Sequence, residues 1–202
     1  MDDFETAPAE SQQDELWLIS YADLLTLLVG FFVLIIASVP LHRARFERIA
    51  AALSGTRTAP LEKLRDKVDS LVARSPELRD HVVTRDDAEG LGIEFKDALL
   101  FPSASAEIRA EARPAVAEIA RLLRELPERP VTIEGHTDDV PIRTPLFKSN
   151  WELSSQRAIN VLNALQSYGV PRERMSARAW ADTRPLGAAD RSVNRRVVIR
   201  VE

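Results

Sequence analysis

One apolar run, residues 16–39, constrains this chain more than any other feature, because its 24 positions include a single charged residue, Asp23. A helix of that length extends about 36 Å at ~1.5 Å per residue, which is enough to cross the hydrocarbon core of a bilayer and is long for a buried helix of a soluble protein. The preceding segment is acidic and contains no Lys or Arg, whereas a signal peptide begins with basic residues. We therefore predict a transmembrane helix over 16–39, which ends at Pro40.

The composition excludes several classes of function. The 202 residues carry a formal net charge of -4, which provides no field that would attract nucleic acid. The absence of cysteine excludes disulfides, a thiolate metal site and a cysteine nucleophile. Apolar residues make up 45% of the chain, which is typical of a folded protein. We expect no cofactor and no nucleic-acid partner.

The rest of the chain divides into three segments. Residues 1–15 are acidic and contain few bulky apolar side chains, so we expect a disordered tail. Residues 40–80 hold two short amphipathic helices, over 41–54 and 61–74, and link the apolar run to the rest of the chain. Residues 81–202 alternate between strand and helix patterns and suffice for one compact α+β domain.

Within the last segment, apolar periodicity predicts a mixed sheet with two main helices, in a βαβαβ-type arrangement. The predicted strands are 82–84, 91–96, 130–134, 175–181 and 196–201, and the predicted helices are 108–125 and 151–168. Gly169 and Pro171 follow the second helix and are typical of a helix end.

Asp23 lies on a narrow, small and polar side of the predicted transmembrane helix. At helical spacing Ser20, Asp23, Thr26, Leu27 and Gly30 share this side, which we name the channel-lining stripe. Such a stripe suits a helix packed inside a protein pore rather than one surrounded by lipid. Two hypotheses remain for Asp23: a helix-end aspartate near the headgroups, or a group that binds and releases a proton or exchanges it for a cation.

The residues around Asp23 form a motif. The sequence Trp17-Leu-Ile-Ser-Tyr-Ala-Asp23-Leu-Leu-Thr26, followed by Phe31-Phe32, resembles the signature of the MotB/PomB family of flagellar stator subunits. The resemblance implies that Asp23 is the ion-binding residue, and it leaves open whether the ion is H⁺ or Na⁺.

The same resemblance implies partners and a further element. It implies a homodimer held inside a ring of MotA/PomA-like multi-spanning subunits, and a single spanning helix per chain cannot enclose a pore alone. It also identifies 41–54 as a periplasmic plug that blocks the channel before assembly. The residues expected on the docking side of the plug are Phe46, Ile49 and Leu53.

Three short segments of the C-terminal half form a second motif. They read Glu-Gly-His-Thr-Asp-Asp at 134–139, Ser-Asn-Trp-Glu-Leu-Ser-Ser-Gln-Arg-Ala at 149–158, and Asn-Arg-Arg-Val at 194–197. Together they resemble the OmpA-like peptidoglycan-binding domain over residues 81–202. The resemblance implies a domain in the periplasm with peptidoglycan as its ligand.

A peptidoglycan stem peptide offers a zwitterion, which one carboxylate and one guanidinium at a fixed distance can bind through charge-assisted hydrogen bonds. The resemblance assigns these roles to Asp138 and Arg157. The residues expected to complete the pocket are Asn150 and Leu153, with assistance from Arg196 or its neighbour Arg195. We also expect Asn150 to be the N-cap of the 151–168 helix and Asp139 to be a surface turn residue.

An enzyme is a competing class. His136, with Glu134, Asp138 and Asp139 close in sequence, could indicate a metal or hydrolytic site. Alternate strand residues point to opposite faces, and no third ligand accompanies His136 and Asp138. The chain also contains no G-x-S-x-G, H-E-x-x-H or Walker motif. We therefore expect a protein without catalytic activity and without a bound metal.

Two alternatives to a flagellar stator remain: a generic OmpA-like wall anchor, or a stator-like subunit of another ion-driven machine, such as one for gliding, outer-membrane energisation or phage defence. An inert anchor has no use for a carboxylate in the membrane, so Asp23 favours an ion-driven role.

The charges beside the predicted membrane helix and the C-terminal motifs indicate opposite orientations. Arg43, Arg45 and Arg48 follow the helix, and the positive-inside rule alone would place that side in the cytoplasm. The motifs after residue 90 have a ligand only in the periplasm, and we give them precedence. The prediction is a single-pass inner-membrane protein with a cytoplasmic tail and a periplasmic C-terminal domain.

Overall fold

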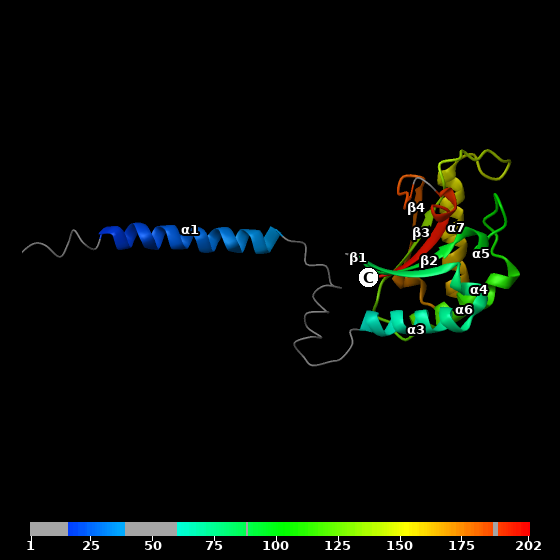
Figure 1. The fold of residues 1–202 in the computed structure, drawn as a ribbon, viewed down its shortest axis with the longest axis horizontal. Helices are drawn as coiled ribbons and strands as arrows, with labels where there is room; N and C mark the ends of the chain where they lie inside the picture. Colours follow the sequence, from blue (N-terminus) through cyan, green and yellow to red (C-terminus); the bar gives the residue numbers. More distant parts are fainter. Residues whose placement is uncertain (1–15, 39–59, 88, 188–189) are drawn as a thin grey trace, which may run out of the picture. The chain divides into compact units, whose positions relative to one another are not determined.

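The computed structural model describes residues 16–38, 60–87, 89–187 and 190–202. The chain divides into two compact units, Met1–Leu41 and His42–Glu202, and each is described by itself. The first contains helix α1, Leu16–Ser38. The second contains a sheet and its covering helices (Figure 1).

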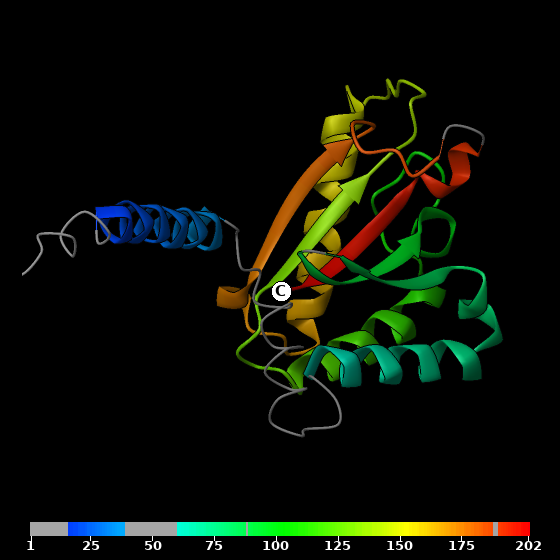
Figure 2. The ribbon, with the colours of Figure 1, turned by 60° about the vertical axis from the view of Figure 1, so that its left-hand side comes forward.

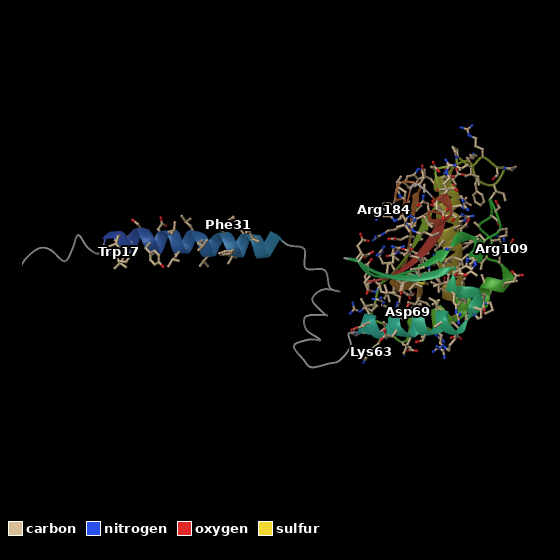
Figure 3. All side chains as sticks on the ribbon, viewed as in Figure 1. Trp17, Phe31, Lys63, Asp69, Arg109 and Arg184 are labelled. Atoms are coloured by element: carbon tan, nitrogen blue, oxygen red, sulfur yellow. The ribbon has the colours of Figure 1, made fainter. Side chains whose placement is uncertain are left out.

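Helix α1 has the length and composition of a membrane span. Trp17–Ile35 has a mean hydropathy of 2.3, and it is the one such helix in the described part of the chain. The 23 residues of α1 give a helix of about 34 Å. The side chains of Trp17 and Phe31 project outward from this helix (Figure 3).

The second unit is built on a mixed five-stranded sheet with strand order β1-β2-β5-β3-β4. Strand β5 is antiparallel to both β2 and β3, and β3 is parallel to β4. The strands are β1 Val82–Asp87, β2 Gly90–Lys96, β3 Val131–His136, β4 Met175–Ala181 and β5 Arg196–Val201. The predicted α+β architecture with a mixed sheet is confirmed.

Three helices cover one face of this sheet: α3 (Pro60–Arg74), α6 (Arg113–Arg124) and α7 (Asn150–Ser167) (Figures 1 and 2). Alternate strand residues point toward them and form the core. The strand residues in this core are Leu91, Ile93, Phe95, Val131, Ile133, Val197, Ile199 and Val201. A short helix, α4 (Pro76–Arg79), follows α3, and another, α5 (Asp97–Leu100), follows β2.

Helix α3 belongs to this domain, although its sequence lies in the range that we assigned to a linker. Leu61, Leu64 and Val68 are buried in the same core as the strands. On the outer side of the helix, Arg65 forms an ion pair with Asp86 of β1 at 2.7 Å. The apolar side predicted for 61–74 is therefore used within the domain.

Two helix starts differ from the prediction. Helix α6 begins at Arg113, because a 3-10 turn at Ala110–Ala112 precedes it. The N-cap of α7 is Ser149 and not Asn150: the Ser149 hydroxyl accepts a hydrogen bond from the Glu152 amide at 3.3 Å. The predicted end of this helix is confirmed, since Gly169 follows it with a φ of 88°, which glycine adopts readily.

Helix α7 and strand β3 touch through their backbones at Gly135. A Cβ atom on Gly135 would lie 2.1 Å from the carbonyl oxygen of Ser154. A side chain at this position would push the helix off the strand, so only glycine permits the observed packing.

The place of α3 in the core yields a stability prediction. Leu64→Ala should lower the free energy of unfolding of the fragment 42–202 by about 2–5 kcal/mol, because it leaves a cavity between α3 and the core. Lys63→Ala, on the exposed side of the same helix, should change it by less than about 0.5 kcal/mol. Urea unfolding measures both. Equal effects of the two substitutions would show that α3 is not part of the cooperative core.

Candidate functional site

Three strand ends meet at one edge of the sheet. Because β5 is antiparallel to both β2 and β3, the carboxyl ends of β2 and β3 lie beside the amino end of β5. Asp97 follows β2, Asp138 lies two residues after β3, and Arg195 precedes β5. The topology therefore gathers two carboxylates and one guanidinium at this edge.

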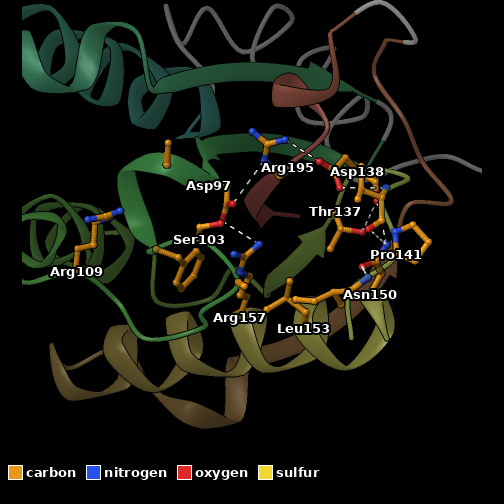
Figure 4. Close-up of a pocket in the computed structure, with 15 residues that line it drawn as sticks. Asp97, Ser103, Arg109, Thr137, Asp138, Pro141, Asn150, Leu153, Arg157 and Arg195 are labelled. Atoms are coloured by element: carbon orange, nitrogen blue, oxygen red, sulfur yellow. Dashed lines mark hydrogen bonds and ion pairs between the residues drawn. The ribbon is translucent and has the colours of Figure 1, made fainter. Parts of the chain in front are cut away.

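These residues line a cavity of about 440 Å³, which is in the usual size range of ligand pockets (Figure 4). We name it the edge pocket. Segments after β2, after β3 and at the start of α7 contribute to it. Its walls are formed by Asp97, Ala98, Phe101, Ser103, Ala104, Arg109, Thr137, Asp138, Val140, Pro141, Ile142, Asn150, Leu153, Arg157 and Arg195. Of the five residues predicted for the ligand pocket, four lie here.

Arg157 is held in a fixed position at the base of the edge pocket. It is only 2% exposed, and its Nη1 lies 2.9 Å from Oδ1 of Asp97 in an ion pair. Its Nε donates a hydrogen bond to the carbonyl oxygen of Ser105 at 2.8 Å, and its guanidinium lies over the ring of Phe101 at 4.9 Å. The guanidinium is therefore oriented on three sides by the protein.

Asp138 is paired in a similar way. Its Oδ2 accepts a hydrogen bond from Nη1 of Arg195 at 2.7 Å, and its Oδ1 accepts one from the Val140 amide at 3.3 Å. Arg195 also lies 3.9 Å from Asp97. Carboxylates and guanidiniums thus alternate along the pocket, and we name Arg157, Asp97, Arg195 and Asp138 the charge row (Figure 4).

Burial shifts the pKa values of two members of the charge row, Asp97 and Arg157. Loss of water raises the pKa of Asp97 above its ordinary value, although the positive charges of Arg157 and Arg195 oppose the shift. Burial likewise lowers the pKa of Arg157, against the effect of Asp97. Each charge opposes the pKa shift that burial causes in its partner, so a ligand that displaces one of them must supply an equivalent contact.

Asn150 and Leu153 shape one wall of the pocket. The Asn150 side-chain amide donates hydrogen bonds to the carbonyl oxygens of Asp138 and Val140 at 3.2 and 3.0 Å, and its oxygen accepts one from the Ile142 amide at 3.2 Å. Asn150 therefore holds the loop that carries Asp138, instead of capping the helix. Leu153 is 5% exposed and packs against Phe147 beneath this loop.

Arg196, the fifth predicted pocket residue, lies on the other side of the sheet. Successive strand residues alternate in direction, so Arg195 turns to the edge pocket and Arg196 turns away from it. Arg196 is 6% exposed and donates hydrogen bonds to the carbonyl oxygens of Asn194 and Arg184, both at 3.2 Å. Of the two arginines considered from sequence, Arg195 is the one that lines the pocket.

The residues that raised the question of an enzyme lie on that same far side. Glu134 and His136 are buried, with Nε2 of His136 3.8 Å from Oε2 of Glu134. Arg200 binds both oxygens of Glu134, at 3.2 and 3.3 Å, and Oδ2 of Asp87 at 2.6 Å. Within the described residues, no group of three or more His, Asp or Glu side chains is arranged to hold a metal ion. Asp139 lies at the surface in an ion pair with Arg191 at 2.8 Å.

Sequence reasoning missed Asp97 and Arg109 as pocket residues. Asp97 lies outside both motifs, and its place beside Asp138 follows only from the strand order. A charged residue directly after a buried strand was the available signal, and it becomes informative once β2 and β3 are known to end at the same edge.

The channel-lining stripe forms one side of α1. Ser20, Asp23, Thr26, Leu27 and Gly30 fall within an arc of roughly 120° on a regular helix. The Thr26 hydroxyl donates a hydrogen bond to the backbone carbonyl oxygen of Asp23 at 2.8 Å. A Cβ atom on Gly30 would meet nothing within 4 Å. The plug candidates Phe46, Ile49 and Leu53 lie outside the described residues.

Two protein-family models match this chain. Residues 4–56 match a family described as the membrane MotB of the proton-channel complex MotA/MotB, and residues 100–198 match the OmpA family. The first match includes the channel-lining stripe and the plug candidates, and the second includes Asp138, Arg157 and Arg195. The chain belongs to the MotB family.

Individual relatives agree with this assignment. Motility protein B of Bacillus subtilis is 29% identical, over 93% of this chain and 90% of that protein. The periplasmic domain of Helicobacter pylori MotB is similar in structure, with a TM-score of 0.57 and 29% identity over 60% of this chain and 81% of that one. The cell wall anchor of the type VI secretion system from Pseudomonas aeruginosa has a TM-score of 0.60 and 33% identity, over 68% of this chain and 97% of that one. These MotB and wall-anchor proteins are structural and motility proteins rather than enzymes.

The buried cluster of Glu134, His136 and Arg200, on the side of the sheet away from the edge pocket, yields a pH prediction. Burial alone would raise the pKa of Glu134, but contacts with His136 and Arg200 outweigh it and lower the pKa from 4.5 to about 2. The resulting stability is present above pH 4.5 and is lost as the pH falls toward 2, by up to about 3 kcal/mol. Urea unfolding of fragment 42–202 across this window should show the loss.

Two variants isolate the contribution of Glu134. Glu134→Gln should flatten the decline of stability between pH 4.5 and 2, because the titrating group is removed. Glu118→Gln, at an exposed position of α6, should leave the decline unchanged. An unaltered pH profile in Glu134→Gln would contradict the prediction.

Proposed function

We propose that this MotB-like protein is the ion-conducting, wall-anchoring subunit of a flagellar stator. One chain combines a membrane span that carries a carboxylate with a domain that carries a charged ligand pocket. This combination supports the proposal, because a motor that generates force against the cell body needs both an ion path and a fixed point.

The charge row suits a zwitterionic ligand. Asp138 can accept hydrogen bonds from an ammonium group, and Arg157 can donate them to a carboxylate. Arg195 pairs with Asp138 and Asp97 pairs with Arg157, and ligand groups of the same charge as Arg195 and Asp97 can exchange with them. Leu153 and the loop after Asp138 provide an apolar wall for the carbon chain of the ligand. A stem peptide of peptidoglycan offers this chemistry.

The membrane half supplies the ion path in this proposal. Asp23 binds and releases the coupling ion, H⁺ or Na⁺, and the remainder of the channel-lining stripe gives it a small and polar surrounding. A second copy of the chain and a MotA/PomA-like multi-spanning partner complete the pore. Residues 41–54 close the pore until the C-terminal domain has bound peptidoglycan. The protein lies in the inner membrane with residues 60–202 in the periplasm.

A generic wall anchor is the second candidate function. The similarity to the type VI secretion wall anchor supports it, because that protein has the same fold and is described as a cell wall anchor of a secretion system, not of a flagellum. The two candidates differ in their use of Asp23, because an anchor alone does not require an ionisable group in the membrane.

Wall binding should depend on both charges of the proposed clamp. The full chain in mild detergent should sediment with purified peptidoglycan sacculi, and Asp138→Ala or Arg157→Ala should each weaken binding by roughly 30-fold or more. Loss of one partner of a desolvated charged contact costs about 2–5 kcal/mol. Asp139→Ala is the matched control, because Asp139 pairs with Arg191 at the surface, and it should bind as the unaltered chain does.

Circular dichroism must show that each of these variants is folded. Binding that is lost in Asp139→Ala but kept in Asp138→Ala would overturn the residue assignment. An unaltered chain that stays in the supernatant would overturn the wall-anchor half of the proposal.

Asp23→Asn should abolish torque and ion flow while leaving the anchor intact. The substitution keeps the size and polarity of the side chain and removes its ability to exchange an ion. Swim-ring diameter, in cells whose motility depends on this chain, measures the effect, and sedimentation of the variant with sacculi controls for intact folding. Asp23→Glu should retain partial motility, because it keeps the charge. Normal motility in Asp23→Asn cells would eliminate the ion-relay role.

A further inference from the structure

Arg109 lines the edge pocket but stands apart from the charge row. In Figure 4 it lies beyond Asp97 and Ser103, on the side of the pocket away from Asp138. Its backbone amide donates to the carbonyl oxygen of Leu100 at 2.8 Å, which fixes its position just before α6. Its side chain is exposed and makes no ion pair or hydrogen bond with another described residue.

The charges of the pocket do not balance, and Arg109 is the reason. Two carboxylates, Asp97 and Asp138, face three guanidiniums, Arg109, Arg157 and Arg195. Arg157 pairs with Asp97 at 2.9 Å and Arg195 pairs with Asp138 at 2.7 Å, so these four charges cancel. One positive charge remains, at Arg109. A zwitterion has no net charge and cannot neutralise it.

The loop between α5 and Arg109 contains a tight turn with an unfavourable backbone conformation. Ala104 has a φ of 55°, an unfavourable conformation for a residue with a side chain, and the Ser105 amide bonds the Pro102 carbonyl oxygen at 3.1 Å to close the turn. Strained residues of this kind cluster at ligand-binding sites. Ala104 and Ser103 both line the pocket, and Ser103 lies between the charge row and Arg109 in Figure 4.

We propose that Arg109 binds a second carboxylate of the ligand whose zwitterionic end lies between Asp138 and Arg157. The pocket then selects an acidic peptide segment with a zwitterionic end, rather than a free zwitterionic amino acid. The inference rests on the proposed wall-binding function and adds a specificity-determining residue to it. Stem peptides of peptidoglycan carry such additional carboxylates, and their amidation would remove the group that Arg109 binds.

Two ligands that differ only in these carboxylates test the proposal. The first is the tripeptide L-alanyl-γ-D-glutamyl-meso-diaminopimelate, and the second is the same tripeptide with every carboxylate amidated except that of its zwitterionic end. Titration calorimetry on the full chain in detergent should give about two- to fivefold tighter binding of the first, the usual effect of an exposed ion pair. The preference should shrink as salt is raised.

The matched variants are Arg109→Gln and Arg113→Gln, because Arg113 is an exposed arginine four residues along the chain that does not line the pocket. Arg109→Gln should bind both tripeptides with the weaker affinity, Arg109→Lys should restore part of the preference, and Arg113→Gln should keep it whole.

The outcomes separate this inference from the function on which it rests. Equal binding of the two tripeptides by the unaltered chain, or an equal loss for both in Arg109→Gln, overturns the role of Arg109 while sacculus binding and its dependence on Arg157 stand. If neither tripeptide binds and the chain does not sediment with sacculi, the wall-binding function fails and this inference fails with it.

Discussion

The edge pocket depends on the buried ion pair between Arg157 and Asp97. Burying two charges is costly, and such a pair contributes little net stability unless further contacts complete it. Here the carbonyl oxygen of Ser105 and the ring of Phe101 complete the surroundings of Arg157. The pair therefore determines the positions of side chains rather than adding stability. It fixes a guanidinium from α7 beside the end of β2, and Arg195 and Asp138 lie next to it in the charge row.

Most of the fold could be predicted because short strand patterns alternate with two clear helix patterns along the second half of the chain. All five strands and the long helix before Gly169 lie where periodicity places them. The role of α3 could not be predicted in this way. Leu61, Leu64 and Val68 form the same stripe whether they face a sheet, a second copy of the chain or a membrane protein, and only the three-dimensional structure shows which surface they cover.

The candidate site likewise contains residues that the sequence predicts and residues that only the structure reveals. Asp138, Asn150, Leu153 and Arg157 lie within sequence motifs, and the structure brings all four to one cavity. Asp97 and Arg109 lie outside the motifs, since their contribution depends on strand order and on the path of a loop. The choice between Arg195 and Arg196 depends on a single residue of strand register, because neighbours on β5 face opposite sides of the sheet. Charge pattern alone does not contain that information.

The contact at Gly135 has a mechanical consequence. Asp138 lies three residues beyond Gly135, and Arg157 lies three residues beyond Ser154, whose carbonyl oxygen touches that glycine. The two ends of the proposed clamp therefore diverge from one point where two main chains meet directly. A layer of side chains at that point could compress or slide under tension, whereas abutting main chains yield very little. An anchor built in this way would keep the distance between Asp138 and Arg157 constant under a pulling force, so the force would not weaken ligand binding by separating the two charges.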